Sequence, residues 1–186
     1  MSTATFIVLI IAIVAVAIAI WAVLRMRNTQ RLRTKFGPEY DRLIQSEGDR
    51  TRAEQELARR EKRVNKFNIR ELSPQERSRF AAAWTNEQSN FVDDPRNAVI
   101  QADTLVTELM TARGYPMGDF RTLAADVSVE HPRVVGNYRE AHDIAEMCRH
   151  GEGSTEQMRQ AMVHYRALFE DLLGASVVEK HVEVTR

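Results

Sequence analysis

The sequence predicts an all-α protein in which a single N-terminal transmembrane helix is followed by a small helical bundle. Three observations support this prediction: an apolar run near the N-terminus, apolar stripes at helical spacing in the remainder, and helix-start signals before those stripes. The composition, with 44% hydrophobic and 28% charged residues, 8 Gly and 5 Pro in 186 residues, is that of a folded domain with few loops.

The apolar run covers residues 6–24 and follows a short N-terminal tail at residues 1–5. Nineteen uncharged apolar residues in a helix span about 28 Å, which matches the hydrocarbon thickness of a bilayer. A buried core helix that is apolar on every face would need protein on all sides, which so small a domain could scarcely provide. A cleaved signal peptide is the alternative, but residues 1–5 lack the positive charges that a signal peptide carries at its start. We therefore expect a transmembrane helix.

A basic juxtamembrane segment at residues 25–37 follows the apolar run and contains no acidic residue. Its five cations are Arg25, Arg27, Arg31, Arg33 and Lys35. The positive-inside rule places such a flank in the cytoplasm, so we expect the N-terminus outside the cell membrane and the soluble domain inside. The opposite orientation, with the domain on the extracytoplasmic side, remains the alternative. Because the whole chain has a net charge of zero, the rest of it is acidic, which disfavours a nucleic-acid partner and leaves the lipid bilayer as the partner of the cations.

Residues 38–67 are predicted to form charged spacer helices. Two helical pieces are expected because Gly48-Asp49 interrupts the segment. The second piece carries one apolar stripe into which Arg60 intrudes, formed by Ala53, Leu57, Val64 and Phe67. A solvated spacer is the plainer interpretation, and a short coiled-coil or partner-docking helix is the alternative.

Residues 68–174 are predicted to form the bundle domain. Four amphipathic helices are expected, each after a start signal: Ser73-Pro74, Asp94-Pro95, His131-Pro132 and Ser154. The first two are joined by a very short connection and should pack antiparallel. A short helix is expected at residues 120–126. The C-terminal tail at 175–186 is interpreted as frayed or as a weak strand.

The common catalytic signatures are missing from the sequence: it contains no HExxH, paired CxxC, P-loop or Glu-x-x-His motif. The lone Cys148 cannot form an intramolecular disulfide and is interpreted as a small buried side chain. A metal site is an alternative interpretation of one helix, because residues four apart lie along one side of a helix. Its candidate ligands are His142, Glu146 and His150, with His164 from the next helix. We predict no catalytic residue and no cofactor.

Five segments of the chain have unusual content: Phe36-Gly37-Pro38-Glu39-Tyr40-Asp41, Phe91-Val92-Asp93-Asp94-Pro95, Arg113-Gly114-Tyr115-Pro116, His131-Pro132-Arg133-Val134-Val135 and Asn137-Tyr138-Arg139. Together they resemble a family of uncharacterised bacterial membrane or "secreted" proteins, over nearly the whole chain. The resemblance implies a bacterial source and an envelope location, and it transfers no catalytic residue. Its "secreted" label disagrees with the orientation that the arginines predict, and we give the arginines more weight.

Taken together, these features favour a membrane-tethered helical adaptor or scaffold that binds a protein partner or self-associates, and not an enzyme. The alternative is a helical domain that binds a metal or small ligand, possibly with enzymatic activity, through the four candidate ligands.

Overall fold

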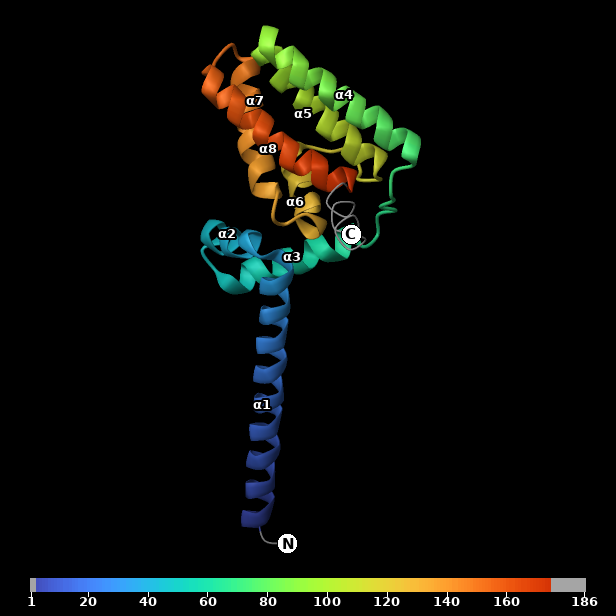
Figure 1. Cartoon of the computed structure of the whole chain (residues 1–186). Helices are drawn as coiled ribbons and strands as arrows, with labels where there is room; N and C mark the ends of the chain where they lie inside the picture. Colours follow the sequence, from blue (N-terminus) through green and yellow to red (C-terminus); the bar gives the residue numbers. More distant parts are fainter. Residues whose placement is uncertain (1–2, 175–186) are drawn as a thin grey trace, which may run out of the picture.

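The computed structural model describes the backbone of residues 3–174, and the tail predicted at 175–186 lies outside the described residues. The described part is entirely helical, as predicted, and contains no strand (Figure 1). Its helices are α1 (Thr3–Phe36), α2 (Pro38–Glu47), α3 (Arg50–Val64), α4 (Pro74–Asp93), α5 (Pro95–Ala112), α6 (Phe120–Glu130), α7 (Val135–Arg149) and α8 (Thr155–Leu173).

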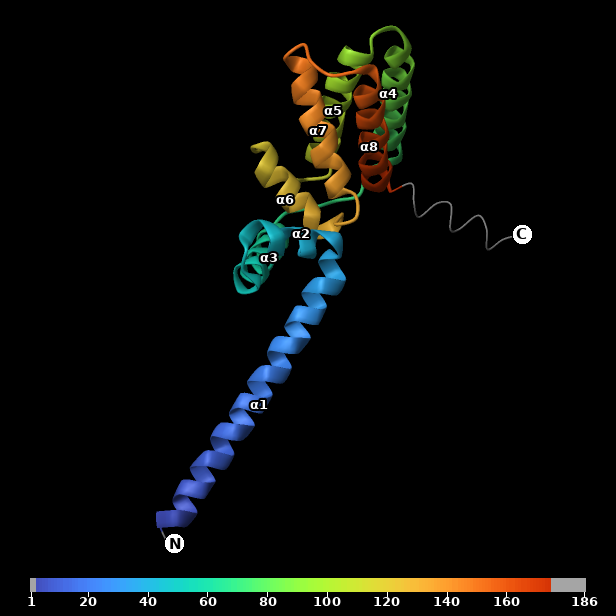
Figure 2. The same ribbon diagram turned by 90° about the vertical axis from the view of Figure 1, so that its left-hand side faces the viewer.

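Helix α1 projects from the other helices, which together form the helical head (α2 to α8; Figures 1 and 2). It is long and apolar enough to cross a membrane, with a mean hydropathy of 2.2. The helix does not end with the apolar run at residue 24 but continues through the basic segment, because Arg, Gln, Leu and Lys are good helix formers. It ends at Phe36 because Gly37 has a positive φ of 46° and Pro38 starts the next helix.

Helices α2 and α3 lie at the upper end of α1, below most of the rest of the head, in both views (Figures 1 and 2). The two expected pieces are present, but they are packed elements and not spacers in solvent. They bury apolar side chains against the last turns of α1 and against α6. This membrane-proximal core contains Leu32, Phe36, Tyr40, Leu43, Ala53, Leu57, Val64 and Val129. The stripe predicted for residues 51–66 is therefore the buried side of α3.

The larger core lies among α4, α5, α7 and α8, with α5 packed against the other three. Two of the predicted helix starts are capping boxes, formed by Ser73 with Glu76 and by Ser154 with Gln157. Trp84 of α4 stacks on Phe169 of α8 with ring centroids 4.9 Å apart. These caps and apolar stripes explain why the bundle was predictable from local sequence.

Two boundaries differ from the prediction. Helix α7 begins at Val135 and not at His131-Pro132, because residues 131–134 form a turn in which the amide of Val134 donates to the carbonyl of His131. Helix α6 continues to Glu130, beyond the expected end at residue 126. Each helix end differs from the prediction by four residues, about one helical turn.

Gly114, just after α5, packs against the backbone of the loop that precedes α4. Its φ is +97°, and a Cβ atom there would lie 2.3 Å from the carbonyl oxygen of Asn68. We therefore expect Gly114→Ala to destabilise the protein by about 2 kcal/mol, from the left-handed backbone and the clash with backbone atoms. Thermal unfolding of the detergent-solubilised chain measures this loss. Gly118→Ala is the matched control, because no atom lies within 4 Å of the added Cβ and its φ is not positive; equal melting of the two variants would contradict the prediction.

Candidate membrane interface and buried ion networks

The basic segment forms the last turns of α1, where it runs beside α3. Lys35 Nζ lies 3.0 Å from Glu61 Oε1, and Arg31 pairs with the same carboxylate. Arg25 donates to Thr51 Oγ1 at 3.1 Å. Three of the five predicted cations are thus bound to α3.

The other two cations, Arg27 and Arg33, are exposed and form no ion pair with any described residue. Trp21, at the end of the apolar run, lies beneath the guanidinium of Arg25 at 5.3 Å from the ring centroid. An aromatic ring followed by free arginines is the usual composition of a helix at the boundary between hydrocarbon and water.

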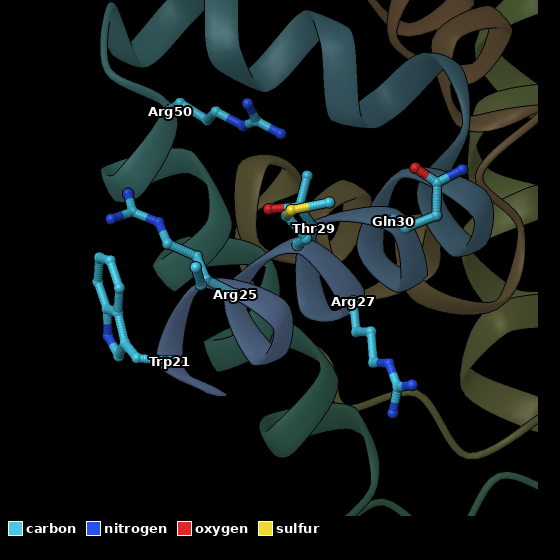
Figure 3. A pocket seen from close by; sticks show the side chains of 8 residues that line it. Trp21, Arg25, Arg27, Thr29, Gln30 and Arg50 are labelled. Atoms are coloured by element: carbon cyan, nitrogen blue, oxygen red, sulfur yellow. The ribbon is translucent and has the colours of Figure 1, made fainter. Parts of the chain in front are cut away.

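A hollow of about 630 Å³ opens at this boundary. Arg25 and Arg50 lie on the same side of it as Trp21, whereas Arg27 extends away from them (Figure 3). The hollow therefore combines an aromatic ring with guanidinium groups from α1 and α3.

Glu39 joins three helices through a buried ion network. Its side chain is 1% exposed, and its carboxylate accepts hydrogen bonds from Arg42 at 2.8 Å, from Arg60 of α3 at 3.0 Å and from Arg139 of α7 at 2.8 and 2.9 Å. Burial alone would raise the pKa of Glu39, but the hydrogen bonds from Arg42 and Arg139 outweigh it and lower the pKa to about 2. The network ties the membrane-proximal helices to the bundle.

The low pKa of Glu39 predicts a loss of stability in acid. A carboxyl group whose pKa falls on folding stabilises the protein above its unfolded pKa, about 4.5, and this contribution is lost as the pH falls from there towards 2. Thermal melting of the full chain in detergent, from about pH 6 to about pH 2.5, should show this decline. Glu39→Gln removes the titrating group, so its melting temperature should fall less steeply over the same range; parallel curves for the two proteins would contradict the assignment.

A second buried carboxylate, Asp103 of α5, joins α7 and α8. It accepts hydrogen bonds from Tyr165 Oη at 2.7 Å and Arg149 Nη2 at 2.6 Å, and it lies 3.1 Å from His142 Nδ1. Burial raises the pKa of Asp103, but the bonds from His142, Arg149 and Tyr165 outweigh it, so the pKa stays below its ordinary value. The ring of Phe120 stacks on His142, with centroids 3.6 Å apart. His142 is thus held between an aromatic ring and an acid.

The four candidate metal ligands do not converge. His142 Nε2 lies 3.8 Å from Glu146 Oε1, but His150 is exposed at the end of α7 and His164 pairs with Glu140 at 3.2 Å. Within residues 10–174, no group of three or more His, Cys, Asp or Glu side chains is arranged to hold a metal ion. Cys148 is buried, which raises its thiol pKa and so disfavours the reactive thiolate.

Two of the segments that carry the family resemblance lie in loops and contact the end of α8. Arg113 donates to the carbonyl of Leu172, and His131 Nδ1 lies 2.6 Å from Asp171 Oδ2. These contacts give Arg113-Gly114-Tyr115-Pro116 and His131-Pro132-Arg133 a structural role.

Comparison with protein-family models, curated proteins and solved structures gives no match for this chain. The resemblance to an uncharacterised bacterial family therefore stays a prediction.

Proposed function

We propose that this chain is a single-pass membrane protein in which α1 anchors a helical interaction module to the cell membrane. The N-terminus lies outside and the helical head lies in the cytoplasm, where it binds a protein partner. The observation that supports this proposal best is the continuity of α1, which runs without a break from the apolar run into the membrane-proximal core. From Leu24 to Phe36 the helix rises about 18 Å, so the head is held at a fixed height and not on a flexible linker.

The proposed orientation is supported by the cations that follow the apolar run, because Arg27 and Arg33 are exposed beside it. Fusions at the C-terminus test the orientation directly. A fluorescent reporter that matures only in the cytoplasm should be active, and an enzyme reporter that folds only outside should be inactive. The reverse pattern would place the head outside and overturn the cytoplasmic assignment.

A partner surface is suggested by a hollow of about 150 Å³ between α4 and α8. Its lining residues are Gln88, Phe91, Arg159, Met162, Val163 and Arg166. Val163 is 52% exposed at this hollow, and Val92, which follows the lining residue Phe91 in sequence, is 81% exposed. Exposed apolar side chains beside a hollow are common at sites of protein association.

Co-purification of the solubilised full chain tests this surface. A partner, or a second copy of the chain, should be recovered repeatedly with the unmodified protein and lost with Val163→Asp. Gln160→Asp is the matched control, since Gln160 is exposed on the same helix but does not line the hollow. Repeated recovery of a lone monomer, or equal recovery with both variants, would count against the proposal.

A further inference from the structure

The acidic and the basic side chains of α3 lie mostly on different sides of the helix. It carries six cations and three acids between Arg50 and Val64. The acids Glu54 and Glu61 are only 11% and 14% exposed and face α1, where Glu54 accepts from Thr29 at 2.8 Å and Glu61 from Lys35 at 3.0 Å. The third acid, Glu56, is bound to Arg59 and Arg60. The negative charge of α3 is therefore largely satisfied within the protein.

The exposed side of α3 is cationic. We define the α3 cationic face as Arg52, Arg59, Lys62 and Lys66, the last of which lies two residues beyond the end of the helix at Val64. Spacings of three, four and seven residues place these side chains on one side of the helix, together with the uncharged Gln55. The side chain of Arg59 is 77% exposed despite its contact with Glu56, so its charge is available to a partner.

The position of α3 brings this face close to the end of the membrane span. Thr29 lies five residues beyond Leu24, so the contact between Thr29 and Glu54 is about 8 Å along α1 from the end of the apolar run. On the bundle side, α6 covers α3 through Val129 and through Asp126, which accepts from Arg63 Nε at 2.6 Å. Figures 1 and 2 place α3 at the end of the head from which α1 leaves.

We propose that the α3 cationic face binds the headgroups of anionic phospholipids, so that α3 is a second membrane contact beside α1. The inference rests on the proposed function, because only an inserted α1 brings α3 to the bilayer. Cations near an anionic membrane surface are attracted to it over about one Debye length. Arg52 lies nearest to the span, because its neighbour Thr51 is contacted by Arg25, the first residue after the apolar run. Neutralising one such cation should weaken the attraction to anionic lipid about fivefold.

A label at Gln55 reports on this contact. The full chain with Cys148→Ala and Gln55→Cys is labelled with a fluorophore and placed in nanodiscs that contain a lipid with a quencher on its headgroup. Quenching should be stronger when part of the phosphatidylcholine is replaced by phosphatidylglycerol, and high salt should reduce the difference. A label at Gln101→Cys, an exposed position on α5, should respond to neither change.

Two matched charge variants show whether the response of the label depends on the α3 cationic face or only on the total charge of the protein. Replacing the four residues of the α3 cationic face by glutamine should remove the response of the Gln55 label to phosphatidylglycerol. Replacing four exposed arginines outside the α3 cationic face, Arg79, Arg96, Arg121 and Arg133, should leave it intact. Equal quenching in both lipid mixtures, or equal loss in both variants, would overturn the inference while the chain stays in the disc. A chain that elutes apart from the nanodiscs would instead contradict the proposed anchoring and with it the inference.

Discussion

Glu39→Gln is expected to destabilise the chain by about 3–5 kcal/mol, because removing one partner of a buried ion pair leaves the other charge uncompensated. The substitution keeps the size of the side chain, yet it leaves the largely buried Arg139 without a carboxylate and the buried Arg60 with Glu56 as its remaining acidic partner. The effect should be greatest in α2 and α3. Thermal unfolding gives the total loss, and hydrogen exchange should show faster exchange in α2 and α3 than in α5.

The control for this prediction is Glu47→Gln, which removes an exposed acid from the end of the same helix and should change stability little. If Glu39→Gln and Glu47→Gln melted together, the ion network around Glu39 would not contribute to stability as described. A double variant with Arg139→Gln should lose less than the two single losses added together, because both substitutions remove the same contact.

Asp103→Asn is expected to cost about 3 kcal/mol through the loss of charge at the centre of the bundle. The amide keeps the shape of the carboxylate but no longer compensates Arg149, and it accepts fewer of the hydrogen bonds from His142 and Tyr165. Chemical denaturation of the solubilised chain, followed by circular dichroism, measures the loss.

Asp143→Asn is the matched control, because Asp143 is exposed on α7 and no ion pair with another described residue involves it. Its unfolding midpoint should stay close to that of the unmodified chain. A midpoint for Asp103→Asn as high as that of the control would contradict the account of the Asp103 network.

The bundle was predictable because its signals are local. Ser73 and Glu76 form their capping box within one helical turn, and the apolar stripes of α5 and α8 repeat at helical spacing. The packing of α2 and α3 was not predictable in this way. Charged side chains cover most of their surface, and the apolar side chains of α2 and α3 acquire partners only when α1, α2, α3 and α6 meet.

The buried carboxylates were missed for the same physical reason. Asp103 lies in the apolar stripe of α5, between Val99 and Val106, which is a signal that could have been noticed. Its partners are 39 to 62 residues away in sequence, and Arg139 is 100 residues from Glu39, so spacing alone does not reveal them. The basic segment was recognised by composition, but its division into bound and free cations depends on the position of α3.

Helix α1 and the bundle are expected to move as one unit, because the membrane-proximal core and the Glu39 network join them. Spin labels at the exposed Thr34 of α1 and the exposed Gln160 of α8, in the Cys148→Ala background, test it through the distribution of distances between them. We expect one narrow distribution in nanodiscs, which Glu39→Gln should broaden. A distribution that is already broad in the unmodified chain would show instead that the head moves freely on its anchor.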